Sequence, residues 1–202
     1  WAKGLGGTSN DRARSITADE FGNVYVTGRF EGTADFDPGA GNMNLVSLGL
    51  EDVFVVKLDF DGNLVWARQI GGPQTDWGRS ITVDEWGNVY TTGEFQGTVD
   101  FDPGSYVSSL TSYGGDDIFI SKLDANGNFV WARQLGGAYD DRGRSIVTDD
   151  LGYVYTTGLF TETADFNPGA SSFNLSSLGG DDIFISKLDN DGNFKWALQL
   201  GG

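Results

Sequence analysis

The sequence is marked first by the side chains that it lacks. Its 202 residues include no cysteine, no histidine and a single methionine. The chain therefore has no disulfide, and it has neither thiolate nor imidazole to act as nucleophile, general base or soft-metal ligand. Any catalysis would have to use carboxylates, hydroxyls or a hard cation.

Basic residues and long apolar runs are scarce as well. Lys and Arg number 13 against 29 Asp and Glu, which gives a net charge of −16 and a pI near 4.1. Nucleic acids and anionic membrane surfaces carry the same sign of charge, so we expect neither as a partner. No apolar segment is long enough to insert into a bilayer. The abundance of glycine and aromatic residues predicts a soluble, exported, all-β protein.

The sequence does contain a repeat with a fixed period. Four tryptophans, spaced 65 residues apart, each open a near-copy of one segment: Trp1, Trp66, Trp131 and Trp196. Because the chain stops as the fourth copy begins, we expect it to be an excerpt from, or the repeating unit of, a longer array. The expected blade repeats are 1–65, 66–130 and 131–195, with the start and first strand of a fourth at 196–202.

Within the first repeat, β-branched and aromatic runs separated by turn residues predict two hairpins. One joins residues 14–19 to residues 24–30, and the other joins residues 52–59 to residues 64–70 through an Asp-Gly dipeptide that would supply the positive φ values of a tight turn. The insert between them, residues 31–51, is expected to form a small extra hairpin at the rim. Long loops of this kind are more often functional than decorative.

The third strand of the repeat is apolar on both faces. Phe54, Val56 and Leu58 alternate with Val53 and Val55, so the sheet must lie between two layers. Four antiparallel strands repeated radially predict a β-propeller or an open fibre of such blades. Three blades are too few to close a ring, and an uncovered blade face would forfeit on the order of 10 kcal/mol. We therefore expect the end faces to be covered by further repeats or by another copy of the chain.

A longer motif recurs in all three copies. It resembles the SBBP-type β-propeller repeat, and this resemblance implies a secreted or surface-exposed bacterial protein with many repeats and no single established activity. The third copy departs from the other two at Tyr153, where Asn23 and Asn88 stand, and at Asn167. The first copy carries the motif as Gly6-Gly7, Asp11, Ser15, Asp19, Gly22-Asn23-Val24-Tyr25, Thr27-Gly28, Asp52, Phe54, Lys57-Leu58-Asp59 and Gly62-Asn63.

The inserts carry the first candidate site, an Asp-Phe-Asp-Pro-Gly loop. Paired oxygens two residues apart could hold calcium, which prefers hard oxygen ligands. Alternatively, the aspartates could accept backbone N–H bonds in a turn before Pro-Gly. The candidate metal ligands are Asp35, Asp37, Asp100, Asp102, Asp165 and Asn167.

Two further acidic motifs bear on calcium binding and catalysis. The Asp59 turn and its copies at Asp124 and Asp189 lack the Glu that an EF-hand loop needs at its twelfth position, so a hairpin turn explains them. Acidic pairs precede each third strand, and some propeller glycosidases use paired carboxylates. Because every pair is repeated in one context, structure or multivalent binding is favoured over a unique active site. The pairs are Glu51-Asp52, Asp116-Asp117 and Asp181-Asp182.

The remaining recurrent residues receive structural interpretations. Arg14, Arg79 and Arg144 are expected to form ion pairs with Asp11, Asp76 and Asp141 that fix the entry of each blade. The repeat tryptophans and Phe54, Phe119 and Phe184 are expected in the core. Contacts with a partner are expected at Tyr106, Tyr113 and Tyr139, and one glycosylation sequon begins at Asn174.

These observations predict a non-enzymatic, extracellular structural or interaction module. Its blades would build a surface protein or a self-assembling fibre, because one heterologous contact repeated without closure gives a filament. Expected partners are further copies of the chain or neighbouring repeats, with a surface polysaccharide as a further candidate. No cofactor other than calcium is expected. The alternative is a calcium-supported propeller that binds or cleaves carbohydrate.

Overall fold

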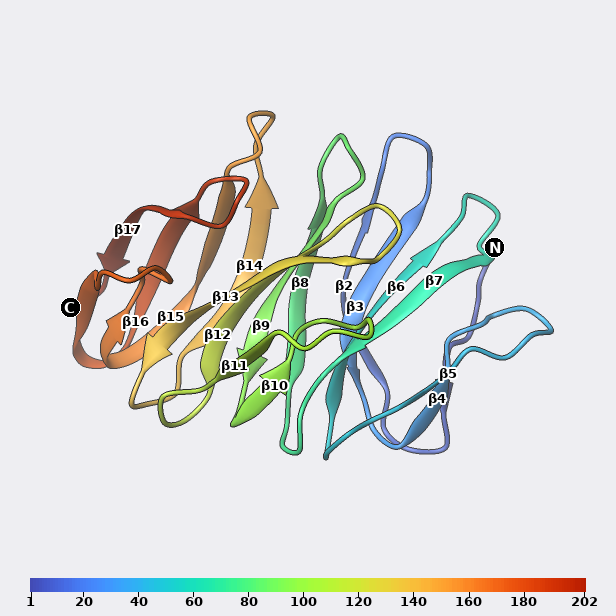
Figure 1. Ribbon diagram of the computed structural model, residues 1–202, viewed down its shortest axis with the longest axis horizontal. Helices are drawn as coiled ribbons and strands as arrows, with labels where there is room; N and C mark the ends of the chain where they lie inside the picture. Colours follow the sequence, from blue (N-terminus) through green and yellow to red (C-terminus); the bar gives the residue numbers. More distant parts are fainter.

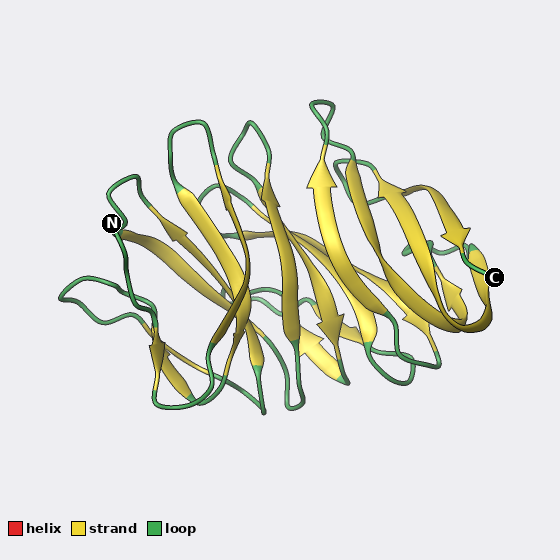
Figure 2. Ribbon diagram, turned by 180° about the vertical axis from the view of Figure 1, so that it is seen from behind, coloured by secondary structure: helices red, strands yellow, loops and turns green.

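The computed structural model describes residues 1–202 and consists of strands and loops (Figure 2). Three four-stranded antiparallel blades lie in a row, with the chain termini at opposite ends (Figure 1). No helix that is long and apolar enough to cross a membrane occurs in the chain. Blade 1 contains β2 (Arg12–Ala18), β3 (Val24–Phe30), β6 (Asp52–Leu58) and β7 (Leu64–Ile70). Blade 2 contains β8 (Trp77–Val83), β9 (Val89–Phe95), β12 (Asp117–Leu123) and β13 (Phe129–Gly137). Blade 3 contains β14 (Arg142–Thr148), β15 (Val154–Asp165), β16 (Asn174–Leu188) and β17 (Phe194–Leu200).

The blades are offset from the sequence repeat. Each tryptophan strand pairs with the strand before it in the chain, so β7, β13 and β17 are the fourth strands of blades 1, 2 and 3. The expectation that residues 196–202 begin a fourth blade is therefore wrong, because β17 completes blade 3. The physical reason is the short turn before each tryptophan strand, which leaves the strand no path except back along its predecessor.

That turn also differs in detail from the expected one. Asp59 N–H donates to the Asn63 carbonyl at 2.8 Å, and Gly62 N–H donates to the Asp59 carbonyl at 2.9 Å. Three residues therefore form the loop, and among them only Gly62 has a positive φ, of 78°. A three-residue hairpin with glycine in the left-handed position follows this pattern. Asp61 does not share the positive φ that the Asp-Gly dipeptide predicted.

The inserts form the expected small hairpins. In blade 1 the hairpin is β4 (Thr33–Asp35) with β5 (Asn44–Val46), and in blade 2 it is β10 (Thr98–Asp100) with β11 (Ser109–Thr111). In blade 3 the hairpin is continuous with β15 and β16. The Gly-Gly segment after each tryptophan strand crosses to the next insert, as β1 (Gly6–Gly7) pairs with β4. A Cβ at Gly72 would lie 2.4 Å from the Thr98 carbonyl oxygen, so this crossing requires glycine.

Apolar cores fill both junctions between blades, as the two-faced strands predicted. Val53 and Ile70 of blade 1 share one core with Ile81 of blade 2. A second core joins blade 2 to blade 3 in the same way, through Ile118, Leu135 and Ile146. A third, smaller core covers the opposite face of blade 1. Stacking of blade on blade therefore builds the two larger apolar cores of the chain.

Polar bonds also join each blade to the next. Trp66 Nε1 donates to the Ala125 carbonyl at 3.1 Å, and Trp131 Nε1 donates to the Asn190 carbonyl at 3.0 Å. Arg133 Nε donates to the Gly192 carbonyl at 2.9 Å, as Arg68 Nε does to the equivalent turn of blade 2. Each bond runs from the fourth strand of one blade to the last hairpin turn of the following blade. The repeated Trp-Ala-Arg sequence thus holds neighbouring blades in register.

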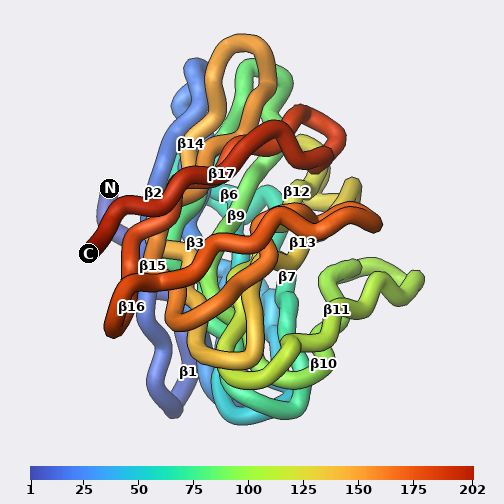
Figure 3. Tube along the Cα trace, turned by 90° about the vertical axis from the view of Figure 1, so that its left-hand side faces the viewer, coloured from blue at the N-terminus to red at the C-terminus, as the bar shows by residue number.

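The first strands of the blades lie next to one another. β8 packs against both β2 and β14, so these three strands form the inner side of the array. Figure 3 looks along the row of blades and shows β2 and β14 on one side, with the insert hairpin β10–β11 on the other. We call β2, β8 and β14 the inner strands, and we call the side of the array that carries β10–β11 the rim.

Candidate functional site

The Asp-Phe-Asp-Pro-Gly loops lie at the rim, where blades meet. Each loop lines a cleft that it shares with the preceding tryptophan segment. The cleft measures about 370 Å³ between blades 1 and 2 and about 230 Å³ between blades 2 and 3. A third cleft, of about 500 Å³, lies between the loop of blade 1 and residues 4–7. The repeat therefore builds an equivalent rim cleft three times.

The structure brings all the candidate metal ligands to these clefts, where they cap turns. Asp100 Oδ1 accepts the N–H groups of Asp102 at 3.1 Å and Ser108 at 2.8 Å. Asp102 Oδ1 accepts the N–H of Gly104 at 2.7 Å. Equivalent bonds form in the other two loops. The cleft-lining candidates are Asp35 and Asp37, Asp100 and Asp102, and Asp165 and Asn167.

The turn caps explain the departure of the third copy. Asn167 Oδ1 accepts the N–H of Gly169 at 2.9 Å, as the carboxylate of Asp37 does from Gly39 at 2.8 Å. An amide oxygen suffices for that bond, so the turn survives the loss of charge. At the first position the backbone bonds lower the pKa of Asp35, with the bond from Asp37 contributing most.

Calcium in the rim clefts stays a proposal. The ion takes roughly six to eight oxygen ligands. Nowhere in the chain do three Asp, Glu, His or Cys side chains gather in an arrangement that could hold a metal ion. A calcium ion in a rim cleft would therefore draw most of its ligands from carbonyl groups and water. The remaining lining of the cleft between blades 2 and 3 includes Tyr113, Arg133 and Gln134, which offer contacts and hydrogen bonds.

The acidic pairs are split between the interior and the junction surface. Asp117 is fully buried, and its Oδ2 accepts a bond from Gln134 Nε2 at 2.6 Å. Asp52 makes the equivalent bond with Gln69. The outer members take other partners, since Glu51 pairs with Arg29 at 3.2 Å. The two carboxylates of a pair therefore do not face one reacting group, as a glycosidase would require.

Buried carboxylates at the junctions have raised pKa values. Burial raises the pKa of Asp76 and of Asp117 to about 7, and that of Asp141 to about 6. Such shifts are common at active sites. Here the carboxylates are sealed from solvent, and they accept backbone bonds, such as those from Gly72 to Asp76 and from Gly137 to Asp141, each at 2.8 Å. They act as structural acids that fix the path between blades.

The expected ion pairs of Arg14, Arg79 and Arg144 with the preceding aspartates are wrong. Asp76 and Asp141 use both oxygens to accept bonds from backbone N–H groups. Arg79 instead pairs with Glu94. The aspartates are turned towards the chain crossing, whereas the arginines are turned towards the inner side of the array.

Two residues at the junction of blades 1 and 2, Trp77 and Arg29, were not singled out from the sequence. Trp77 lies between the guanidinium groups of Arg29, at 3.9 Å, and Arg79, at 4.3 Å. Trp77 Nε1 donates to Glu51 at 2.9 Å. The sequence marks this place by variation, because Glu94 in the second copy and Leu159 in the third stand at the position equivalent to Arg29. A difference between near-identical repeats marks a place where each junction has its own chemistry.

The remaining residues singled out from the sequence are divided among the core, the hairpin turns and the surface. Trp66 and Trp131 are buried, as are Phe54, Phe119 and Phe184, whereas Trp1 and Trp196, in the first and last copies, are 66% and 36% exposed and do not lie in the core. Asp59 caps its hairpin turn by accepting from Asn63 N–H at 2.8 Å, and Asp124 and Asp189 do the same. Three tyrosines and the sequon asparagine are exposed: Tyr106, Tyr113, Tyr139 and Asn174.

The fold and the junctions define a class of protein. Four-stranded antiparallel blades, stacked through apolar faces around adjacent inner strands, form a β-propeller-type array. A family model described as "Beta-propeller repeat" (SBBP) matches residues 1–29, 65–94 and 130–159. The chain thus carries three tandem matches to the SBBP β-propeller repeat.

Two curated relatives match most of the chain. The regulatory protein FlaEY of Caulobacter vibrioides is 27% identical over 190 residues, which cover 94% of this chain and 19% of that protein. The WD repeat-containing protein L264 of Acanthamoeba polyphaga mimivirus is 25% identical over 173 residues, which cover 73% of this chain and 12% of that protein. The chain therefore spans less than a fifth of the length of either relative.

Proposed function

We propose that the chain is a non-enzymatic interaction module whose blades add end to end to further blades of the same kind. The observation that carries this proposal is the exposure of both terminal blade faces. Ile16, on blade 1, is 68% exposed, whereas its equivalents Ile81 and Ile146 are 4% and 3% exposed. Ile183, on blade 3, is 51% exposed, whereas its equivalent Ile118 is fully buried.

The two open faces are complementary to each other. Within the chain, residues equivalent to Ile183 and Leu200 pack against residues equivalent to Ile16 at both junctions. Beside Ile16 lies an apolar groove of about 560 Å³ that also includes Val24, Val26 and Leu58. The occupant that fits this groove is the open face of blade 3 in a second copy. Such a head-to-tail contact is heterologous, so it leads to rings or filaments.

Several observations support an interaction role over catalysis. The chain lacks histidine and cysteine, and its buried carboxylates cap backbone groups. One relative is named a WD repeat-containing protein and another a regulatory protein. The proposed location is outside a bacterial cell, which rests on the resemblance to SBBP repeats. Protease treatment of intact cells would test it, since a protein inside the cell would survive.

The test of end-to-end assembly uses two face variants, Ile16→Asp and Ile183→Asp. Sedimentation velocity over a concentration series should show the unmodified chain forming species larger than a dimer. Assembly needs a blade 1 face on one molecule and a blade 3 face on another. Each variant alone keeps only one of these two faces intact, so it should stay monomeric. An equimolar mixture of the two should form dimers and nothing larger, because one intact face of each kind remains.

The matched control is Val107→Asp, which places a charge on an exposed loop of the central blade. It should assemble like the unmodified chain. A chain that stays monomeric throughout the series, or face variants that assemble normally, would refute the proposal. Symmetric dimers that survive both substitutions would point to a different interface.

A further inference from the structure

The inner strands concentrate the positive charge of an acidic chain. Five of the eight arginines in the sequence lie on β2, β8 and β14: Arg12, Arg14, Arg79, Arg142 and Arg144. The net charge of the whole chain is −16. Repulsion of an anion by distant carboxylates is screened beyond about 8 Å at physiological ionic strength, so this local cluster can still attract one.

A β-bulge directs one arginine of each blade. The pairing register of β8 with β9 skips from Gly78 to Ser80 and leaves Arg79 as the extra residue. The same skip leaves out Arg14 on β2 and Arg144 on β14. A bulge interrupts the ladder and re-aims the side chain of the extra residue. The three copies therefore present a guanidinium at the same place on the inner edge of each blade.

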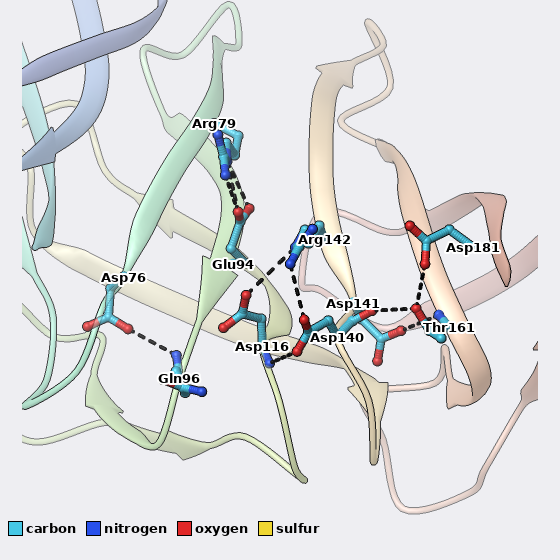
Figure 4. A network of polar contacts seen from close by, with 10 residues as sticks. All are labelled: Asp76, Arg79, Glu94, Gln96, Asp116, Asp140, Asp141, Arg142, Thr161 and Asp181. Carbon is cyan, nitrogen blue, oxygen red and sulfur yellow. Dashed lines mark hydrogen bonds and ion pairs between the residues drawn. The ribbon is translucent and has the colours of Figure 1, made fainter.

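Blade 2 shows which kind of group this guanidinium binds. Arg79 Nε donates to both carboxylate oxygens of Glu94, at 3.0 and 2.9 Å, and a terminal nitrogen of Arg79 adds a further bond (Figure 4). Forked bonding of this kind is the preferred geometry between guanidinium and carboxylate. The positions equivalent to Glu94 are Arg29 in blade 1 and Leu159 in blade 3, so only blade 2 supplies its own carboxylate.

Arg14 and Arg144 are left without an acceptor. Neither side chain forms an ion pair or hydrogen bond within the chain, whereas the neighbouring Arg142 pairs with Asp140 at 3.1 Å and Asp116 at 3.7 Å. The pKa of Arg144 is lowered, and burial is the largest cause. The nearby Arg79, Arg142 and Arg14 also lower this pKa, whereas Glu94 raises it. Guanidinium groups gathered in this way are stabilised when an anion joins them.

We propose that the bulge arginines Arg14 and Arg144 bind the carboxylate groups of an acidic polysaccharide along the inner strands. Glu94 occupies the corresponding position in blade 2 as a built-in carboxylate. A polymer with one carboxylate per sugar matches a site that recurs once per blade. An acidic peptide is disfavoured, because the bulges interrupt the edge that a β-strand would join. The inference rests on the interaction role proposed above and does not require end-to-end assembly.

Binding of oligogalacturonate, measured by titration calorimetry, tests the site. Because charge-assisted bonds contribute about 1.5–3 kcal/mol, Arg14→Gln and Arg144→Gln should each weaken binding by about tenfold or more. Lys195→Gln removes the same charge from an exposed residue of β17, off the inner strands, and should leave affinity within about twofold. Fully methyl-esterified oligogalacturonate, which has no carboxylates, should not bind.

A gain of affinity separates a binding role from a structural one. Glu94→Leu copies the residue of blade 3 and frees Arg79, so folded Glu94→Leu should bind oligogalacturonate several-fold more tightly. Glu20→Gln, which removes one negative charge from an exposed turn, should not. If Glu94→Leu does not fold, the two arginine variants still decide the question.

Three results would overturn the proposal. These are affinity unchanged in Arg14→Gln and Arg144→Gln, binding of the methyl-esterified probe, and binding of poly-glutamate as tight as that of oligogalacturonate. The last result would identify an acidic peptide as the ligand. Sedimentation of the same variants reports assembly separately, so loss of the ligand and loss of assembly are distinguishable.

Discussion

The junctions inside the chain and its two open faces use the same repeat positions in different surroundings. Ile118 and Leu135 are fully buried by blade 3, whereas Ile183 and Leu200 occupy the same positions and are exposed. Arg133 reaches the turn of the next blade, while the equivalent residue of blade 3 is Leu198. The apolar positions are thus repeated unchanged, and the polar contact is the part that varies.

The two internal junctions also differ from each other. Between blades 1 and 2, Trp77 lies between two guanidinium groups and bonds to Glu51. Between blades 2 and 3, Arg142 occupies the position of Trp77 and pairs with Asp116 and Asp140 (Figure 4). A common apolar core therefore makes the fold, and a few substituted positions on the inner strands give each junction its own charge.

The sharpest test of the comparison truncates the same position in a junction and on a face. Ile118→Ala removes a fully buried side chain and should destabilise the chain by about 2–5 kcal/mol. Ile183→Ala, on the open face, should cost less than about 1 kcal/mol. Urea unfolding of dilute monomer measures both. An equal loss in the two variants would mean that the face is covered in solution.

The junction carboxylates predict an unusual dependence of stability on pH. The folded-state pKa values of Asp76 and Asp117 are raised to about 7. Folding therefore takes up protons between about pH 4 and pH 7, so stability falls as pH rises through this range. A tenfold difference in proton affinity between the folded and unfolded chain corresponds to about 1.4 kcal/mol of stability. Turn caps such as Asp35 and Asp59 have lowered pKa values and oppose further gain below about pH 4.

Thermal unfolding across this range measures the effect. We expect a higher Tm near about pH 5 than near about pH 8. Asp117→Asn should flatten the profile, because it removes a titrating group while keeping the shape of the side chain. Glu20→Gln serves as the surface control and should preserve the slope. A profile that rises from acid to neutral pH in the unmodified chain would contradict the raised pKa values.

Exchanging the polar contact between a junction and a face should have a smaller effect. Arg133→Leu places the residue of blade 3 in the junction and removes bonds to the carbonyl groups of Gly192 and Asp191. It should cost about 1–3 kcal/mol. The reverse change, Leu198→Arg, has no following turn to reach in the monomer and should be neutral within about 0.5 kcal/mol. Stabilisation by Leu198→Arg in the monomer would show that the arginine acts through its own strand instead.

The repeat architecture could be predicted from the sequence because its signals are local and occur three times. Both faces of residues 53–58 are apolar, and the structure buries both. The blade boundaries could not be taken from the period alone, since a repeat of 65 residues can be divided at any point. Only the pairing of β7 with β6 assigns Trp66 to blade 1.

The direction of the arginines was harder to predict for a related reason. Arg79 and Asp76 are close in sequence, which suggested an ion pair. A bulge at Arg79 and two backbone bonds to Asp76 turn the side chains towards different partners. Glu94 lies on the neighbouring strand, and its pairing depends on the register of β8 with β9. Charges adjacent in sequence therefore predict little until the strand register is known.

The smallest expected effect concerns the rim, where the three copies are nearly identical. Asp100→Ala removes the acceptor for two backbone N–H groups and should cost about 1–2 kcal/mol. Asp100→Asn keeps one acceptor oxygen, and the amide oxygen of Asn167, at the position equivalent to Asp102, shows that an amide can cap this loop, so the substitution should cost less than about 0.5 kcal/mol. The measurement is the Tm of the unmodified chain and of both variants, with added Ca²⁺ and with a chelator. If the aspartates act as turn caps alone, Ca²⁺ should leave the order and the spacing of the three Tm values unchanged. A Tm that rises with Ca²⁺ in the unmodified chain and not in Asp100→Asn would instead place calcium in the rim cleft.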